Sequence, residues 1–186
     1  MIGLATMFGV GRVKTAPGTF GSLVATLLAY PVLLLPMGWA IMAGSILVLV
    51  VLGSFAAHAY MQAHRIPEQA ILHDPSAIVV DEWAGQWLTF TIWHTWMFFM
   101  AADAQAGQVL VNDMATSIPH LFYGFVLFRF FDVMKPWPIR WADRHIKGGF
   151  GVIFDDLLAG IAAGTMLYVI YFFAPLISGH MMESHA

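Results

Sequence analysis

The sequence contains no cysteine, and only 10% of its 186 residues are charged. The missing thiols exclude disulfide bonds, thiolate catalysis and cysteine-bound zinc, although they do not identify a cellular compartment. A soluble domain carries about 25% charged residues. Here the shortage of charge accompanies 60% hydrophobic residues and a mean hydropathy of +0.76. The composition therefore predicts an integral membrane protein.

Basic residues are scarce as well. The chain has 8 Lys and Arg residues against 11 Asp and Glu, for a formal net charge of -3. This balance offers no basic excess to a nucleic-acid backbone, so nucleic acid is not an expected partner. Nothing in the sequence indicates an obligate protein partner. The length favours a single domain over residues 1–186, and the N-terminus lacks the leading positive charge of a signal peptide.

Apolar stretches approach or reach the roughly 17–25 residues that a helix needs to cross a bilayer. The first stretch is short and contains Pro31, so we expect it to tilt, kink or insert only in part. The sequence predicts an all-α, polytopic membrane fold of about five transmembrane or re-entrant helices. The predicted spans are residues 22–35, 39–57, 83–102, 118–131 and 157–177.

The positive charges test this set of spans. All 8 Lys and Arg residues fall on one side: before the first span, between the second and third, or from Arg129 in the last turn of the fourth span to the start of the fifth. The connections on the other side of the membrane and the C-terminal tail have none. Because positive charge is retained in the cytoplasm, the N-terminus and both charged loops are predicted to be cytoplasmic.

Carboxylates gather at the same predicted depth. Asp81 and Glu82 precede the third span, and Asp132 ends the fourth. Asp155 and Asp156 precede the fifth span. Such pairs commonly cap helices, where the helix dipole favours their charged form. Clustering of carboxylates near a low-dielectric boundary favours a metal site instead, and a set of oxygen ligands indicates Mg²⁺ or Mn²⁺.

Basic and hydroxyl groups lie beside these carboxylates. Arg129 and Lys135 flank Asp132 at intervals of three, close to one face of the helix end, where an arginine can bind a phosphate with two donors. Arg140 begins a charged stripe on a short interfacial helix, which binds either the substrate or anionic lipid head groups in general. Thr19 and Ser22 stand in a Gly- and Pro-containing turn that either caps a helix or donates hydrogen bonds to a phosphate.

Four charged blocks, read in order, resemble the phosphatidylglycerophosphatase A family. The blocks are residues 16–22 (APGTFGS), 74–85 (DPSAIVVDEWAG), 128–139 (FRFFDVMKPWPI) and 148–160 (GGFGVIFDDLLAG). Each block alone is weak, whereas the four together at these spacings are specific. Lys14 stands where many relatives are expected to have proline.

The resemblance implies a bacterial inner-membrane enzyme that hydrolyses phosphatidylglycerophosphate to phosphatidylglycerol and phosphate with Mg²⁺. Its active site would face the cytoplasm, and its substrate would be a membrane phospholipid. The implied metal ligands are Asp81, Glu82, Asp132, Asp155 and Asp156, and all of these except Asp155 are also expected to be catalytic. The expected substrate contacts are Thr19, Ser22, Arg129, Lys135 and Arg140.

Two other functions use carboxylates in a membrane protein. A cation- or proton-coupled transporter usually holds them near the bilayer midplane, where the predicted spans carry no acid. A lipid phosphotransferase would share the metal and phosphate chemistry but needs a second substrate that carries an alcohol. Release of inorganic phosphate distinguishes hydrolysis from both.

Overall fold

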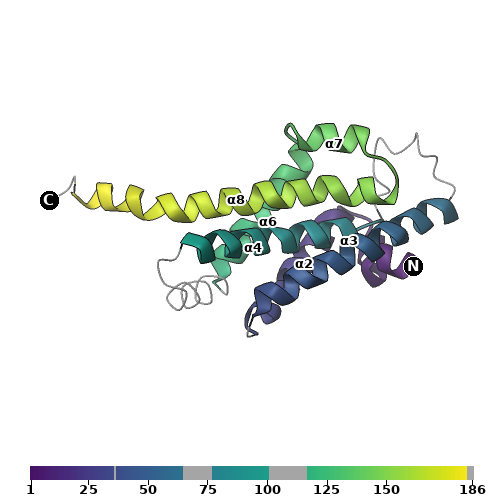
Figure 1. Cartoon of the computed structure of the whole chain (residues 1–186), viewed down its shortest axis with the longest axis horizontal. Coiled ribbons are helices and arrows are strands. Elements are labelled where there is room, and N and C mark those ends of the chain that lie inside the picture. Colours follow the sequence, from purple (N-terminus) through teal and green to yellow (C-terminus); the bar gives the residue numbers. More distant parts are fainter. Residues whose placement is uncertain (36, 65–76, 101–116, 184–186) are drawn as a thin grey trace.

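The computed structural model describes residues 1–35, 37–64, 77–100 and 117–183. Every regular element in these ranges is a helix, as the sequence predicts (Figure 1). In chain order they are α1 (Ile2–Ala5), the 3-10 helix η1 (Met7–Arg12), α2 (Pro17–Leu33), α3 (Gly38–Ala63), α4 (Val80–Met100), α6 (Ile118–Met134), α7 (Ile139–His145) and α8 (Gly148–Glu183).

Five long helices coincide with the predicted spans, and two of them meet the length and hydropathy of a membrane helix. These are Gly38–Ala63 in α3 and Gly148–Phe173 in α8, while α2 is a shorter apolar helix. The protein is therefore suited to membrane association. A crossing by α4 or α6 stays a prediction. The final residues of the predicted third span, 101–102, lie outside the described residues.

Two helices, α2 and α8, begin five and nine residues earlier than the hydropathy pattern predicts. Pro17 starts α2 at a position where its fixed φ favours a helix and its missing N–H is not needed. Gly148, with φ +81°, starts α8. Asp155 and Asp156 consequently lie two turns inside α8, so the prediction that they sit at a helix N-terminus is wrong. Hydropathy misses these first turns because glycine, proline and the two aspartates interrupt their apolar residues.

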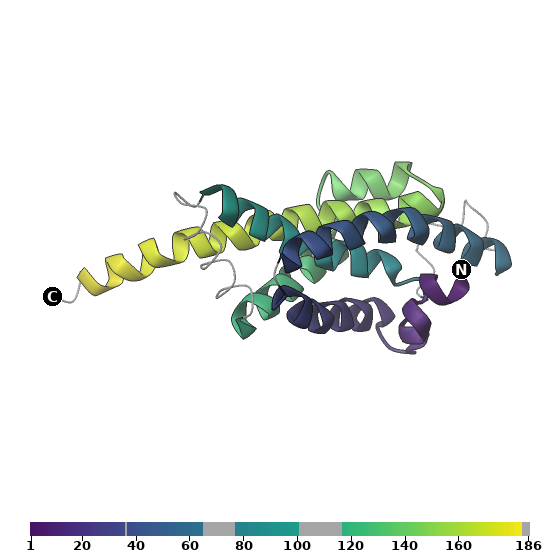
Figure 2. The same ribbon diagram turned by 60° about the horizontal axis from the view of Figure 1, so that its bottom comes forward.

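Helix α4 lies at the centre of the bundle, in contact with α2, α3, α6 and α8. Its most extensive contact is with α8, and both views show the two helices side by side (Figures 1 and 2). The backbones approach closely at Gly85 and Gly160, where a Cβ on Gly160 would meet the Gly85 carbonyl oxygen at 2.5 Å. Small residues at such a crossing allow tight packing of membrane helices.

One end of the bundle collects the polar segments. The first turns of α2 and α4 meet the last turn of α6 there, as the approach of Gly18 to Glu82 and Arg129 shows. The early turns of α8 join them through the ion pair of Asp155 with Lys135 at the C-cap of α6. The predicted gathering of charged windows at one depth therefore corresponds to one end of the folded protein.

Candidate functional site

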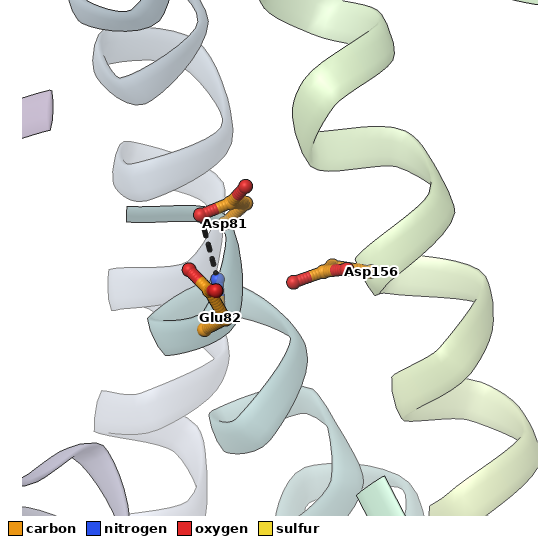
Figure 3. A group of neighbouring side chains, drawn as sticks. All are labelled: Asp81, Glu82 and Asp156. Carbon is orange, nitrogen blue, oxygen red and sulfur yellow. Dashed lines mark hydrogen bonds between the residues drawn. The ribbon is translucent and has the colours of Figure 1, made fainter. Parts of the chain in front are cut away.

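Three carboxylates form the centre of this end. Asp81 and Glu82 occupy the first turn of α4, and Asp156 points toward them from α8 (Figure 3). One ligand oxygen of each lies within 4.8 Å of the others. Asp81 and Asp156 are each only 4% exposed. The backbone N–H of Glu82 donates to Asp81 Oδ1 at 3.0 Å, which orients one member of the cluster.

The negative charge of this cluster is poorly balanced. Burial is the main cause that raises the pKa of Glu82 to about 8, and the charges of Asp156 and Asp132 act in the same direction. A hydrogen bond with Asp81 and the charge of Arg129 oppose the rise. Glu82 Oε2 is buried and has no hydrogen-bond partner among the described residues. A divalent cation bound by oxygen ligands fits this arrangement, because it would satisfy that atom and offset the repulsion.

Asp132 lies beside the three carboxylates and is paired with a basic residue. Its Oδ2 is 2.5 Å from Nη1 of Arg129, three residues earlier on α6. Its carboxyl also interacts with that of Asp156, so it extends the acidic group toward α6. The structure thus places the predicted ligand Asp132 between the central cluster and the predicted phosphate contact Arg129.

Asp155 and Lys135 face each other on another side of α8. Lys135 Nζ donates to Asp155 Oδ2 at 2.5 Å and to Asp143 Oδ1 at 2.8 Å. The Lys135 backbone has a left-handed conformation that ends α6, with φ +41°. Asp155 therefore pairs with Lys135 and is not a member of the group of three, although its charge still acts on that of Asp156. Lys135 connects α6, α7 and α8 in this arrangement.

The start of α2 approaches the carboxylates from the other side. A Cβ on Gly18 would collide with Glu82 Oε1 and lie 3.4 Å from Arg129 Nη1, so only glycine fits without displacement. Ser22 Oγ donates to the Gly18 carbonyl at 2.9 Å and accepts from Arg129 at 3.4 Å. Thr19 is half-buried in the same turn. No side chain of the described residues caps this N-terminus, which leaves its N–H groups suited to an anion.

Arg140 is not brought to the central carboxylates. It lies in α7, whose existence as a short helix is confirmed, and its Nη2 donates to the carbonyl oxygen of Met134 at 3.2 Å. Trp137 and Trp141 beside it are 83% and 51% exposed. This position suits contact with lipid head groups at an interface, which is one of the two roles that the sequence leaves open for the stripe.

Gln86 was not predicted as a site residue. It is fully buried one turn after Glu82 on α4, and neither its amide nitrogen nor its amide oxygen has a hydrogen-bond partner within the described ranges. Residues four apart share a helix face, so Gln86 lies below Glu82 on the same side of α4. The i, i+4 spacing was visible in the sequence, but the burial of the amide was not.

Comparison with known proteins shows the family to which the chain is related. The family model described as Phosphatidylglycerophosphatase A matches residues 3–171. A phosphatidylglycerophosphatase A from Escherichia coli is 35% identical over 173 residues, covering 93% of this chain and 84% of the relative. The Haemophilus influenzae phosphatidylglycerophosphatase A is 31% identical over 171 residues, covering 91% and 87%. A candidate phosphatidylinositol-3-phosphatase from Bacteroides thetaiotaomicron is 32% identical over 167 residues, covering 89% and 90%. No solved structure gives a significant match.

Proposed function

The chain belongs to the phosphatidylglycerophosphatase A family and has its phosphatidylglycerophosphatase activity, and we propose that its hydrolysis of phosphatidylglycerophosphate depends on Mg²⁺. The ion would be held by Asp81, Glu82 and Asp156. The observation that carries the proposal is the buried, unpartnered Oε2 of Glu82 within a group of three carboxylates. Oxygen ligands of this kind favour Mg²⁺ over softer metals.

The neighbouring residues would supply the remaining parts of a hydrolysis. When bound, Mg²⁺ supplies positive charge that polarises the phosphate group. Arg129 lies where its guanidinium can offset charge on the transferring phosphoryl group, together with Ser22 and the first turn of α2. Water attacks phosphorus, its proton passes to Glu82, and the bond from phosphorus to the glycerol oxygen breaks. The departing glycerol oxygen takes that proton back from Glu82, which gives phosphatidylglycerol and inorganic phosphate.

The proposed place of this chemistry is the cytoplasmic face of a bacterial inner membrane that the chain crosses several times. Two helices have the length and hydropathy to cross a membrane. Apart from Arg12 and Lys14 near the N-terminus, the described basic residues lie between the last turns of α6 and the start of α8. Retention of positive charge in the cytoplasm supports this orientation. A lipid head group is presented at that interface, so the substrate phosphate would reach the carboxylates without leaving the membrane.

Phosphatidylglycerophosphate is the proposed substrate, because two matching relatives carry names for that activity. The test supplies purified protein with phosphatidylglycerophosphate and, in parallel, phosphatidylinositol 3-phosphate, the kind of lipid that the name of the Bacteroides relative indicates. We expect inorganic phosphate and phosphatidylglycerol in equal amounts from the first lipid, and slower release from the second. Consumption of the first lipid without phosphate release would instead support a phosphotransferase.

A further inference from the structure

A groove of about 640 Å³ lies between α2 and α6, outside the carboxylate cluster. Its walls are almost entirely apolar, and several of their side chains are exposed at its open side, with Leu27 at 63%, Phe122 at 58% and Ile118 at 80%. Because α2 and α6 are predicted to lie in the membrane, we expect this groove to open sideways into the lipid rather than into water.

The groove leads to the polar end of the bundle. Thr26 lines it one turn below Ser22 on α2, and Phe125 lines it one turn below Arg129 on α6. Ser22 and Arg129 contact each other at 3.4 Å, so they connect the two walls at the end nearest the carboxylates. Four helical residues rise about 6 Å, which places the apolar walls directly below the proposed phosphate contacts.

We propose that this groove holds an acyl chain of the phospholipid substrate while its phosphate lies at Arg129 and the carboxylate cluster. The proposal rests on the proposed function. It commits to a lipid chain because the chemistry of the groove matches one: a cationic guanidinium at one end, hydrocarbon along about 10 Å of helix, and an opening toward the bilayer. The hydroxyl of Thr26, the most deeply buried polar group in the wall, already donates to the Ser22 carbonyl at 2.8 Å and requires no ligand.

A second apolar groove offers a matched control. It lies between α4 and α8, has a volume of about 340 Å³ and is lined by residues that include Ile92, Phe99 and Ile161. Neither groove has a basic residue among its described lining residues, but Arg129 stands one turn beyond the first groove, whereas Leu88 and Leu157 stand one turn beyond the second. A lipid chain in this second groove would therefore lack the neighbouring cation that fixes the head group. Filling it changes apolar volume in the bundle without reaching the proposed phosphate contacts.

The test compares Leu27→Trp, which fills the first groove, with Ile161→Trp, which fills the second. Both side chains are exposed, so each variant should fold, and Phe122→Trp fills the first groove from its opposite wall. The kinetic constants kcat and KM are measured on long-chain phosphatidylglycerophosphate and on its water-soluble dihexanoyl form. Binding of the long-chain lipid is measured separately by native mass spectrometry.

We expect Leu27→Trp and Phe122→Trp to raise KM for the long-chain lipid about fivefold, since the chain loses roughly ten van der Waals contacts in the groove, which are what holds apolar groups together within a bilayer. Their constants for the dihexanoyl lipid should match those of the wild type, and Ile161→Trp should match it on both lipids. Equal kinetic constants for all proteins, or equal losses of activity in Leu27→Trp and Ile161→Trp, would overturn the proposal that the groove holds an acyl chain. If the wild type releases no phosphate while Leu27→Trp still weakens lipid binding, the proposed function fails and the groove stands.

Discussion

At the scale of single residues, the chemistry depends on how three buried carboxylates are held. Asp156 is the member that α8 contributes, and it points at the pair on α4 (Figure 3). Asp156→Asn keeps the shape of the side chain while removing one charge. We expect at least a 100-fold loss of kcat, because several kcal/mol of transition-state stabilisation depend on the cation that this group would hold.

The control for Asp156→Asn is its stability. Because Asp156 is buried among the like charges of Asp132 and Asp81, its replacement should leave the melting temperature of chelator-treated protein equal or higher. Melting is followed by circular dichroism in the same detergent. A variant that keeps wild-type kcat would remove Asp156 from the mechanism, and one that fails to fold would show a structural role instead.

The raised pKa of Glu82 predicts that the stability of the metal-free protein depends on pH. Its pKa rises from 4.5 to about 8 in the folded protein, mainly through burial, so the folded state retains a proton that the unfolded state releases. The stability from this group is complete below pH 4.5 and is lost as the pH rises through about 8. With chelator present, we expect the melting temperature to fall between those limits, and Glu82→Gln should flatten the fall.

The same measurement with Mg²⁺ separates ligand binding from burial alone. A cation that binds the folded state stabilises it according to its concentration, and it binds best when the carboxylates are ionised. Added Mg²⁺ should therefore raise the melting temperature more at pH 8 than at pH 5. An equal shift at both values, or none, would contradict a carboxylate-held ion.

Gln86 provides a test in which stability and activity change in opposite directions. Its amide is buried without a partner in the described part of the chain, a state that costs about 1–3 kcal/mol. Gln86→Leu should therefore stabilise the substrate-free protein, and it should lower kcat/KM if the amide meets the substrate below Glu82. Unchanged kcat/KM in a stabilised variant would show that Gln86 serves only the packing of α4.

At the scale of helices, the contact of α4 with α8 determines the geometry of the site, because it joins Asp81 and Glu82 to Asp156. Gly160→Ala places a methyl group against the Gly85 carbonyl, and we expect a destabilisation of about 1–3 kcal/mol with a loss of activity. Gly44→Ala in α3 meets nothing within 4 Å and should be neutral or stabilising by up to about 1 kcal/mol. Thermal unfolding of the two variants gives the comparison, and similar values for both would contradict the close crossing.

The sequence predicts the helices and the polar end better than the pairings within it. Hydropathy locates α2, α3, α4, α6 and α8, since long apolar runs depend only on local composition. The sequence places Asp155 and Asp156 together at one predicted depth. In the folded protein they face different partners, because successive residues on a helix point about 100° apart. Asp155 meets Lys135, and Asp156 meets α4, which no local pattern could specify. Gln86 was missed for a related reason, because its burial depends on the packing of other helices.

At the scale of the whole molecule, the distribution of positive charge predicts its orientation in the membrane. The absence of cysteine makes this testable with single-cysteine variants on a background free of thiols. Lys147→Cys lies in the connection between α7 and α8, and Met37→Cys lies in the turn between α2 and α3, 63% exposed. In intact spheroplasts a membrane-impermeant maleimide should label Met37→Cys and spare Lys147→Cys. Inside-out vesicles should give the reverse pattern, and equal labelling would contradict the orientation.

The most direct test of the central claim is the rate of phosphate release from phosphatidylglycerophosphate as free Mg²⁺ is varied. The purified protein is first treated with a chelator, and the rate is followed as Mg²⁺ is restored. The account predicts that release stops without the ion and returns to the original rate at saturation, with Asp81→Asn and Asp156→Asn remaining inactive. Undiminished phosphate release by the metal-free protein would contradict it.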